Sequence, residues 1–197
     1  MIYLNLLINN ITSPKIRTST WLGNLCKLAA GHKSYNGGCL NGRYHGVGNL
    51  SYSDGGFYSG ELLNGLRNGQ GTMEYSLDHK DGRMKYVGEW LNNMITGFGK
   101  LIWQNGDEYV GFFKNGLKHG SGTYTWLNGD KDIGKFEDGK RNGFGTYLWA
   151  DGDSYVGHWK NGLKHGYGTY FEDEDGEGSG ETTVAIWERG KVVQYIS

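Results

Sequence analysis

The hydrophobic positions of this chain repeat with a period of 23 residues. We mark the start of each unit at Tyr35, Tyr58, Tyr86, Tyr109, Asp132 and Tyr155. Successive marks lie 23 residues apart except for one interval of 28, and a degenerate seventh unit begins at Thr183. Glycine follows each mark two positions later, and a large or soft apolar residue follows four positions later, as in Tyr109, Gly111 and Phe113. Self-similarity at a fixed period indicates a repeat architecture.

Each unit has the pattern of a β-hairpin. Positions 0, 2 and 4 of a unit share a parity, as do positions 11, 13, 15 and 17, which is the period of two expected of strands. Glycine at position 7 and Asp-Gly or Asn-Gly near position 20 supply residues that tolerate positive φ in tight turns. A helical interpretation fails because glycine at this density would cost about 1 kcal/mol per residue. The order strand, turn, strand, turn therefore describes every unit.

Parity places the aromatic residues on one face of the sheet, which we call the aromatic face. It carries the tyrosine at each mark, the apolar residue at position 4 and the second-strand residues at positions 15 and 17. The glycines at positions 2, 11 and 13 lie on the same face, so neighbouring rings have room to lie flat against the backbone. We therefore expect one sheet to pack without a second layer. The opposite face mixes Val87, Val110 and Ile133 with threonines and charged residues, and we expect it to be largely solvated.

Composition excludes several classes of protein. Of 197 residues, 36 are Gly, one is Pro and 14% are aromatic, which is incompatible with collagen and with a disordered chain. A net charge of −1 argues against a nucleic-acid partner. Cys26 and Cys39 suffice for neither a disulfide framework nor a metal quartet, which fits a reducing compartment. No run reaches the ~18 apolar residues of a membrane helix, and the segment from Met1 to Ile8 makes a poor secretory signal. We expect a cytoplasmic protein.

The pattern resembles the MORN repeat family (membrane occupation and recognition nexus). The clearest units are Tyr109-Val-Gly-Phe-Phe-Lys-Asn-Gly-Leu-Lys-His-Gly-Ser-Gly-Thr-Tyr and Tyr155-Val-Gly-His-Trp-Lys-Asn-Gly-Leu-Lys-His-Gly-Tyr-Gly-Thr-Tyr. The resemblance is strong over residues 35–171 and weak over 172–190, and it departs from the pattern at Cys39, Leu62 and Asp132. It implies an all-β fold, an elongated single twisted antiparallel sheet of hairpins with a shallow aromatic groove. It also implies a role in tethering or organising proteins at membranes and cytoskeletal structures, or as an accessory module of an enzyme complex.

The two ends lie outside the regular repeats. Residues 1–34 lack the period, and we expect them to form a cap, irregular or with a short helix over 19–30, that covers the first edge of the sheet. An amphipathic membrane or partner helix is the alternative there. Six repeats fill 35–171, and 172–197 hold an acidic insertion, the degenerate seventh repeat and a tail. We interpret the insertion as a solvated hairpin tip. A calcium loop would need a bidentate Glu at its twelfth position, where this chain has Val184.

No catalytic or metal-binding constellation is recognisable in the sequence. His45, His119 and His165 recur at one position, but they lie one per unit and therefore ~10 Å apart, too far to share a metal ion. The Gly-x-Gly pairs open no helix, so they do not form a phosphate loop. No Gly-x-Ser-x-Gly motif is present. We therefore expect no enzymatic activity, no cofactor and no metal.

Charges separate onto the two long edges of the predicted sheet. The turn after the first strand of the units carries cations, which form the cationic edge: Arg43, Arg67, Lys114, Lys118, Lys140, Arg141, Lys160 and Lys164. The other turn carries acids: Asp54, Asp107, Glu108, Asp130, Asp151 and Asp153. The two edges are interpreted either as solvated turns, as a surface for a partner or for anionic lipid, or as a means of antiparallel self-pairing into a homodimer.

These observations predict a non-catalytic, protein-binding or scaffolding module that presents an aromatic groove to a partner protein or peptide, with association to a membrane or the cytoskeleton. We expect the ligand-facing row at position 17, near the strand ends where packing neighbours are fewer, whereas Trp90 and Trp159 at position 4 are expected to be structural. The predicted groove consists of Tyr75, Trp103, Trp126 and Trp149, with Tyr124 and Tyr147 beside them. One alternative is binding of phosphoinositide or other anionic phospholipid along the cationic edge, which would depend steeply on salt. The other is glycan binding, with the three tryptophans stacked on sugar faces.

Overall fold

The structure, a computed structural model, describes residues 26–174, 176 and 178–196. These residues form one antiparallel sheet of fourteen strands whose spatial order follows the chain, and none of them lies in a helix. The strands are β1 His32–Leu40, β2 Arg43–Tyr52, β3 Phe57–Leu63, β4 Leu66–Glu74, β5 Arg83–Leu91, β6 Met94–Trp103, β7 Glu108–Lys114, β8 Leu117–Thr125, β9 Lys131–Glu137, β10 Lys140–Leu148, β11 Ser154–Lys160, β12 Leu163–Asp173, β13 Gly180–Glu188 and β14 Lys191–Tyr195. The predicted fold, a single sheet of repeated hairpins, is confirmed.

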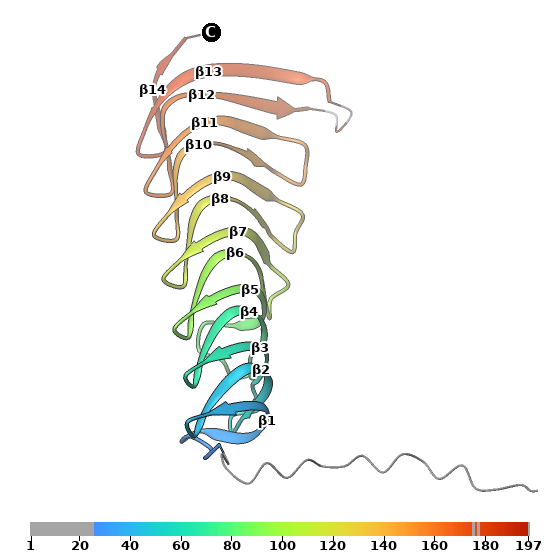
Figure 1. Cartoon of the computed structure of the whole chain (residues 1–197). Coiled ribbons are helices and arrows are strands. Elements are labelled where there is room, and N and C mark those ends of the chain that lie inside the picture. The colour runs from blue at the N-terminus through green and yellow to red at the C-terminus, as the bar shows by residue number, and fades with distance from the viewer. Residues whose placement is uncertain (1–25, 175, 177, 197) are drawn as a thin grey trace, which may run out of the picture.

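The sheet is long and bent across its width. The strands stack one after another along the long axis, with short turns on one side and longer loops on the other (Figure 1). Each strand is bent into an arc. The bend brings Lys118 Nζ at the start of β8 to 4.2 Å from the ring centroid of Tyr124, six residues further along the same strand. The aromatic face is therefore the concave face.

The core consists of tyrosines that lie on pairs of glycines. Tyr58, Tyr86, Tyr109 and Tyr155 have no exposed surface. Tyr109 illustrates the arrangement: a Cβ at Gly111 would come within 2.6 Å of the Tyr109 Oη. The hydroxyl donates a hydrogen bond to the carbonyl of Phe112 at 3.1 Å. The ring packs edge-on against Phe113 and Phe136 at centroid distances of 5.1 and 5.2 Å, which links one hairpin to the next.

In the fifth unit an ion pair replaces the core tyrosine. Asp132 stands at the mark, and its carboxylate pairs with the guanidinium of Arg141, both residues being 5% exposed. The guanidinium lies over the glycine pair, with Nη2 3.2 Å from where a Cβ of Gly134 would be. It also stacks between Phe136 and Trp159, at 5.7 and 4.6 Å from their ring centroids. Burial lowers the pKa of Arg141 to about 10.

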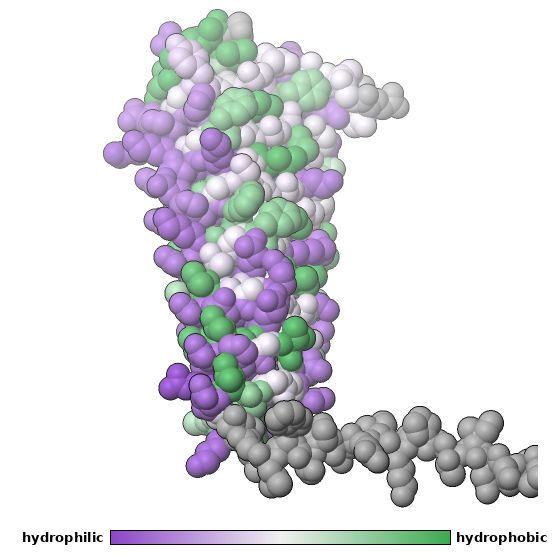
Figure 2. Space-filling model, in the orientation of Figure 1, coloured by the Kyte–Doolittle hydropathy of each residue, from purple (hydrophilic) through white to green (hydrophobic). Residues whose placement is uncertain are grey.

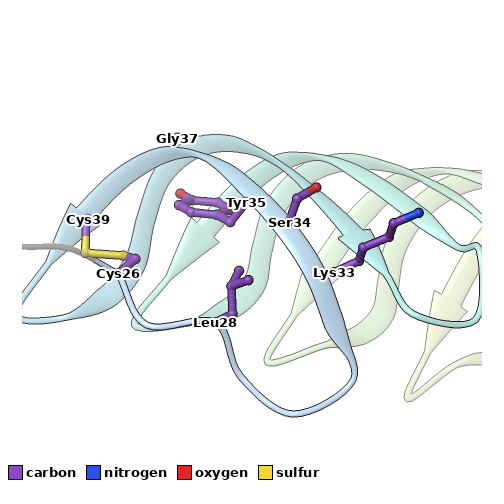
Figure 3. Close-up of a pocket in the computed structure, with 7 residues that line it drawn as sticks. All are labelled: Cys26, Leu28, Lys33, Ser34, Tyr35, Gly37 and Cys39. Atoms are coloured by element: carbon purple, nitrogen blue, oxygen red, sulfur yellow. A yellow bond between two sulfur atoms is a disulfide. The ribbon is translucent and has the colours of Figure 1, made fainter. Parts of the chain in front are cut away.

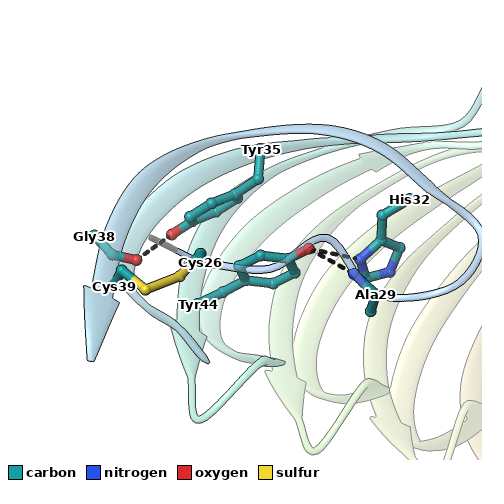
Figure 4. The surroundings of a disulfide bond; sticks show 7 residues. All are labelled: Cys26, Ala29, His32, Tyr35, Gly38, Cys39 and Tyr44. Atoms are coloured by element: carbon teal, nitrogen blue, oxygen red, sulfur yellow. Dashed lines mark hydrogen bonds between the residues drawn. A yellow bond between two sulfur atoms is a disulfide. The ribbon is translucent and has the colours of Figure 1, made fainter. Parts of the chain in front are cut away.

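The first hairpin is tied to the chain that precedes it. The expected helix over 19–30 falls mostly outside the described residues, and Cys26–Ala30 is irregular. Contrary to the expectation of reduced thiols, a disulfide joins Cys26 to Cys39 in β1 (Figure 4). The Tyr44 hydroxyl accepts a hydrogen bond from the Ala29 N–H at 3.1 Å. Proximity of the two cysteines depends on the path of this non-repeat segment, which the repeat pattern does not encode.

The seventh unit completes the sheet with β13 and β14. Ala185 replaces the usual glycine and is fully buried, and the Trp187 ring packs against Tyr155 at 5.5 Å. Part of the acidic insertion is described, and there the Asp173 carboxylate accepts hydrogen bonds from the N–H groups of Gly176 and Gly178 at 3.0 and 3.3 Å. This carboxylate is thus engaged by its own loop.

Candidate partner-binding groove

The concave face holds a continuous row of rings, which we call the ladder. Its members are Trp103, Tyr124, Trp126, Tyr147, Trp149 and Tyr170. Successive ring centroids are 5.2, 4.6, 5.2, 4.5 and 5.6 Å apart. All six residues are partly exposed. Five of the six predicted groove residues are therefore brought together, whereas Tyr75 lies apart and packs on His79 at 4.6 Å.

Carboxylates hold the ladder tyrosines in place. Tyr124 Oη donates to Asp107 Oδ2 at 2.7 Å, and Asp107 Oδ1 accepts from the Leu127 N–H at 3.1 Å. Asp130 binds Tyr147 Oη and the Ala150 N–H in the same way, at 2.8 and 2.9 Å. Asp153 repeats the arrangement with Tyr170 and the Asp173 N–H. Each acid therefore fastens the loop and the ring of the following hairpin.

These hydrogen bonds act on the acidity of the carboxylates. Burial tends to raise the pKa of Asp107, but the hydrogen bonds from Tyr124, Asn105 and the Leu127 backbone outweigh it and hold that pKa below its usual value. Asp130 behaves in the same way through Tyr147 and Ala150. Asp107, Asp130 and Asp153 were expected at the acidic edge. In the structure they lie at that edge and also bind the ladder tyrosines.

The indoles of the described residues divide into three groups, one of which is Trp159 and Trp187, whose Nε1 is buried without a hydrogen-bond partner. Trp90 is 3% exposed and its Nε1–H donates to the carbonyl of Gly71 at 3.2 Å. By contrast, Nε1 of Trp103, Trp126 and Trp149 has no hydrogen bond to any described residue and is not buried. The ladder thus offers one unused N–H donor per hairpin over three hairpins, on rings that the tyrosines hold in position.

The structure splits the cationic edge into two sets of four. Arg43, Lys114, Lys140 and Lys160 are exposed at the short turns. Arg67, Lys118, Arg141 and Lys164 extend over rings of the aromatic face instead. Lys164 Nζ lies 4.6 Å from the centroids of Tyr155 and Trp187 and 4.9 Å from those of Trp149 and Tyr170.

Burial lowers the pKa of the two inward lysines. It lowers the pKa of Lys118 to about 8, against the opposing effect of Asp107, and it lowers the pKa of Lys164 against Asp153. The signal for their orientation was present in the sequence, because the inward cations stand at position 9 of their units. That position has the same parity as the ring positions 15 and 17, whereas Lys114 and Lys160 stand at position 5, at the ends of β7 and β11, with the parity opposite to that of the ring positions 0 and 4.

The opposite face is more apolar than expected. Phe98, Phe112 and Phe144 are 51%, 49% and 56% exposed, and Phe98 packs on Phe112 at a centroid distance of 5.5 Å. With Val110 and Ile133 the first two phenylalanines line a shallow depression of about 490 Å³. In Figure 2, apolar side chains are interspersed along the body of the sheet, while polar ones gather along the edge formed by the short turns.

A second open depression, of about 430 Å³, lies at the first hairpin (Figure 3). The disulfide of Cys26 and Cys39 closes one end, Leu28 and Tyr35 form its walls, and Lys33 lies at the other end. Its polar groups do not form a nucleophile–base pair. Over the described residues, no three His, Cys, Asp or Glu side chains are grouped to hold a metal ion. Those residues also include no helix that could cross a membrane.

Comparison with known proteins gives one clear result. A family model described as the MORN repeat matches residues 35–57, 58–76, 86–108, 109–131, 133–154 and 155–175, which together exceed half of the chain. No curated protein sequence matches the chain. Among solved structures, the E1021V mutant of the TCP10 domain of Danio rerio CPAP is similar, at 16% identity over 76% of this chain and 71% of that chain, with a TM-score of 0.29. An overlap that weak carries no conclusion about this chain.

Proposed function

Since this chain belongs to the MORN repeat family, we propose that it is a non-catalytic binding module whose ladder holds a segment of a partner protein. MORN repeats are repeat modules that bind proteins or membranes. The observation that carries the proposal is the ladder itself: six contiguous, partly exposed rings, tilted against one another, with three unused indole N–H groups.

The ladder has the properties of a recognition surface. Aromatic side chains bury a large area at low entropic cost and often act as anchors of an interface. Here the cost is further reduced, because Asp107, Asp130 and Asp153 already fix the ladder tyrosines before a partner arrives. From Trp103 to Tyr170 the ladder crosses three hairpin steps, or ~29 Å at ~4.8 Å per strand. A segment of about nine extended residues spans that distance.

Binding of anionic phospholipid remains a second candidate, because Arg43, Lys114, Lys140 and Lys160 are exposed along one edge. This row is reduced from eight cations to four, and Glu137 and Asp138 interrupt it in the fifth unit. Lipid binding would weaken steeply with salt. Attachment of the protein to a membrane or to the cytoskeleton, in the cytoplasm, is part of the proposal in either case.

The test compares ladder and core tryptophans. We expect Trp126→Ala and Trp149→Ala to keep a melting temperature close to that of the wild type and to lose the partner in a pull-down. Trp90→Ala should unfold the protein far more readily, since truncation of a buried Trp costs roughly 3–5 kcal/mol. If the ladder variants are as unstable as Trp90→Ala, or if they retain the partner, the ladder is not the binding site.

A further inference from the structure

We propose that the segment that fits the ladder is a basic, proline-rich peptide in the polyproline II conformation. The inference rests on the proposed function, since it names the class of partner for the same site. Three properties of the ladder support it: the spacing of its rings, its unused donors and the charge along its edge.

The spacing of the ladder selects the conformation of the peptide. Equivalent rings recur once per hairpin, every ~9.6 Å at ~4.8 Å per strand. Polyproline II rises ~3.1 Å per residue with three residues per turn, so it presents the same side every ~9.3 Å. Over the three hairpin steps of the ladder the mismatch amounts to only ~1 Å.

Other regular conformations do not keep register with the hairpins. An α-helix advances ~9.6 Å in about 6.4 residues, which turns its contact side away by ~80° at each hairpin. An extended strand advances ~10 Å in three residues, but its side chains alternate, so the third residue points to the opposite side. Only polyproline II repeats the same contact at every hairpin.

The donors of the ladder match what such a peptide exposes. Polyproline II has no internal hydrogen bonds, and its carbonyl groups are open to solvent. Nε1 of Trp103, Trp126 and Trp149 is neither buried nor bonded among the described residues, and these nitrogens recur with the hairpin period. One carbonyl in every three residues can therefore accept from one indole, while proline rings pack on the exposed surface of the aromatic rings, the mode of recognition typical of aromatic grooves for proline-rich segments.

The charge at the loop edge of the ladder is complementary to a basic peptide. Asp107, Asp130 and Asp153 line that edge, and the exposed Asp151, Glu172 and Glu174 lie near the Tyr170 end of the ladder. Lys118 and Lys164 offset part of the charge of Asp107 and Asp153, but Asp130, Asp151, Glu172 and Glu174 form no ion pair with a described residue, so this edge keeps an excess of negative charge. Arg141 is paired with Asp132, and Lys118 and Lys164 are held over rings. Lysine or arginine residues of the peptide therefore belong at the end that lies over the loops after β10 and β12.

The test uses three synthetic peptides and the full chain. The first probe is four Ala-Pro-Pro triplets followed by Lys-Lys, the second replaces every Pro by Gly, and the third replaces Lys-Lys by Glu-Glu. We expect titration calorimetry to show the first probe binding at least tenfold more tightly than either of the others. A first probe that binds no more tightly than the Gly peptide overturns the inference.

Two variants locate the interaction. Trp126→Phe keeps a ring and removes the N–H, and we expect a five- to tenfold loss of affinity for the first probe with an unchanged melting temperature. Phe112→Ser on the opposite face is the matched control and should leave the affinity unchanged. Equal effects of the two variants contradict the inference.

The outcome also separates this inference from the proposed function. If the first probe fails but the partner captured by the wild type is still lost in Trp126→Ala and Trp149→Ala, the ladder binds a segment of another class, and only the present inference is wrong. If the first probe fails and capture does not depend on either tryptophan, both are wrong.

Discussion

Tyr109 and the glycines beneath it make the fold sensitive to a single methyl group. Gly122 has an extended backbone that any residue can adopt, but a Cβ there would overlap the Tyr109 hydroxyl and ring. The ring cannot lift away without leaving Phe113 and Phe136. We expect Gly122→Ala to lower the free energy of unfolding by about 1–3 kcal/mol, as overpacking does.

Urea denaturation measures this cost, and the neighbouring residue provides the control. Ser121 is exposed on the opposite face, so Ser121→Ala should change the free energy of unfolding by less than ~0.5 kcal/mol. Equal effects of the two substitutions would mean that the glycine pair does not carry the packing.

The Asp130 carboxylate couples the ladder to pH. Although burial alone would raise its pKa, the hydrogen bonds from Tyr147 and Ala150 hold the pKa in the folded protein below that of the unfolded chain. The stabilisation is therefore complete above the unfolded pKa of ~3.9 and is lost as the pH falls through the folded value. We expect Asp130→Asn to lower the melting temperature at pH 7, and the difference from the wild type to shrink toward pH 2. A difference that does not depend on pH contradicts this account.

Residue identities and parity predicted which side chains pack on the aromatic face, but not the hydrogen bonds and ion pairs of its charged residues. The alternation placed the core tyrosines, the glycines at positions 2 and 13 and the ladder rings on one side, and the structure agrees. The prediction for position 11 was wrong: these glycines have positive φ, and a Cβ there would meet side chains of the opposite face, such as Glu89 at Gly97 and Phe112 at Gly120. The bonds of Asp107 and Asp130 to tyrosines 17 residues later require the register between hairpins and the bend of the strands. Position 9 places Arg141 on the inward side, but its pairing with Asp132 in the fifth unit depends on how far the guanidinium reaches across the face, which parity does not give.

At the scale of elements, the Cys26–Cys39 disulfide acts on the first hairpin only. It closes a loop with a sequence separation of 13 residues, so its removal should cost that part of the protein about 3 kcal/mol. Consecutive strands contact one another and distant ones do not, so the loss should stay local. We expect Cys39→Ser to speed amide hydrogen exchange in β1 and β2 and to leave β9 to β12 unchanged. Faster exchange throughout the sheet would show that the repeats unfold as one unit.

Hairpins could be predicted from the sequence because each is a local unit with its own turn residues. The interval between the second and third marks is longer than the period, and the extra residues lie in the long connection between β4 and β5. The cap could not be predicted in the same way. Its contacts, such as the hydrogen bond from Ala29 to Tyr44, join a segment without periodicity to the first hairpin.

At the scale of the whole molecule, a single sheet of this kind must be elongated. Fourteen strands at ~4.8 Å extend roughly 60 Å along the axis, whereas a compact chain of this length has a radius of gyration of about 16 Å. We expect small-angle X-ray scattering from a variant that begins at Cys26 to give a radius of gyration near ~20 Å and a skewed distance distribution. A symmetric distribution at ~16 Å would contradict the single sheet.

The sequential strand order also sets how this protein responds to tension. The strands lie across the long axis, so a force that draws the two ends apart loads the hydrogen bonds between the outermost pair of strands first. The hydrogen bonds between successive strand pairs then break one pair of strands at a time, rather than all bearing the load together in shear. Each hairpin that peels away releases about 80 Å of chain, at ~3.4 Å per residue. A molecule built in this way extends at low force. A partner bound across several hairpins would hold them together and raise the force needed to separate them.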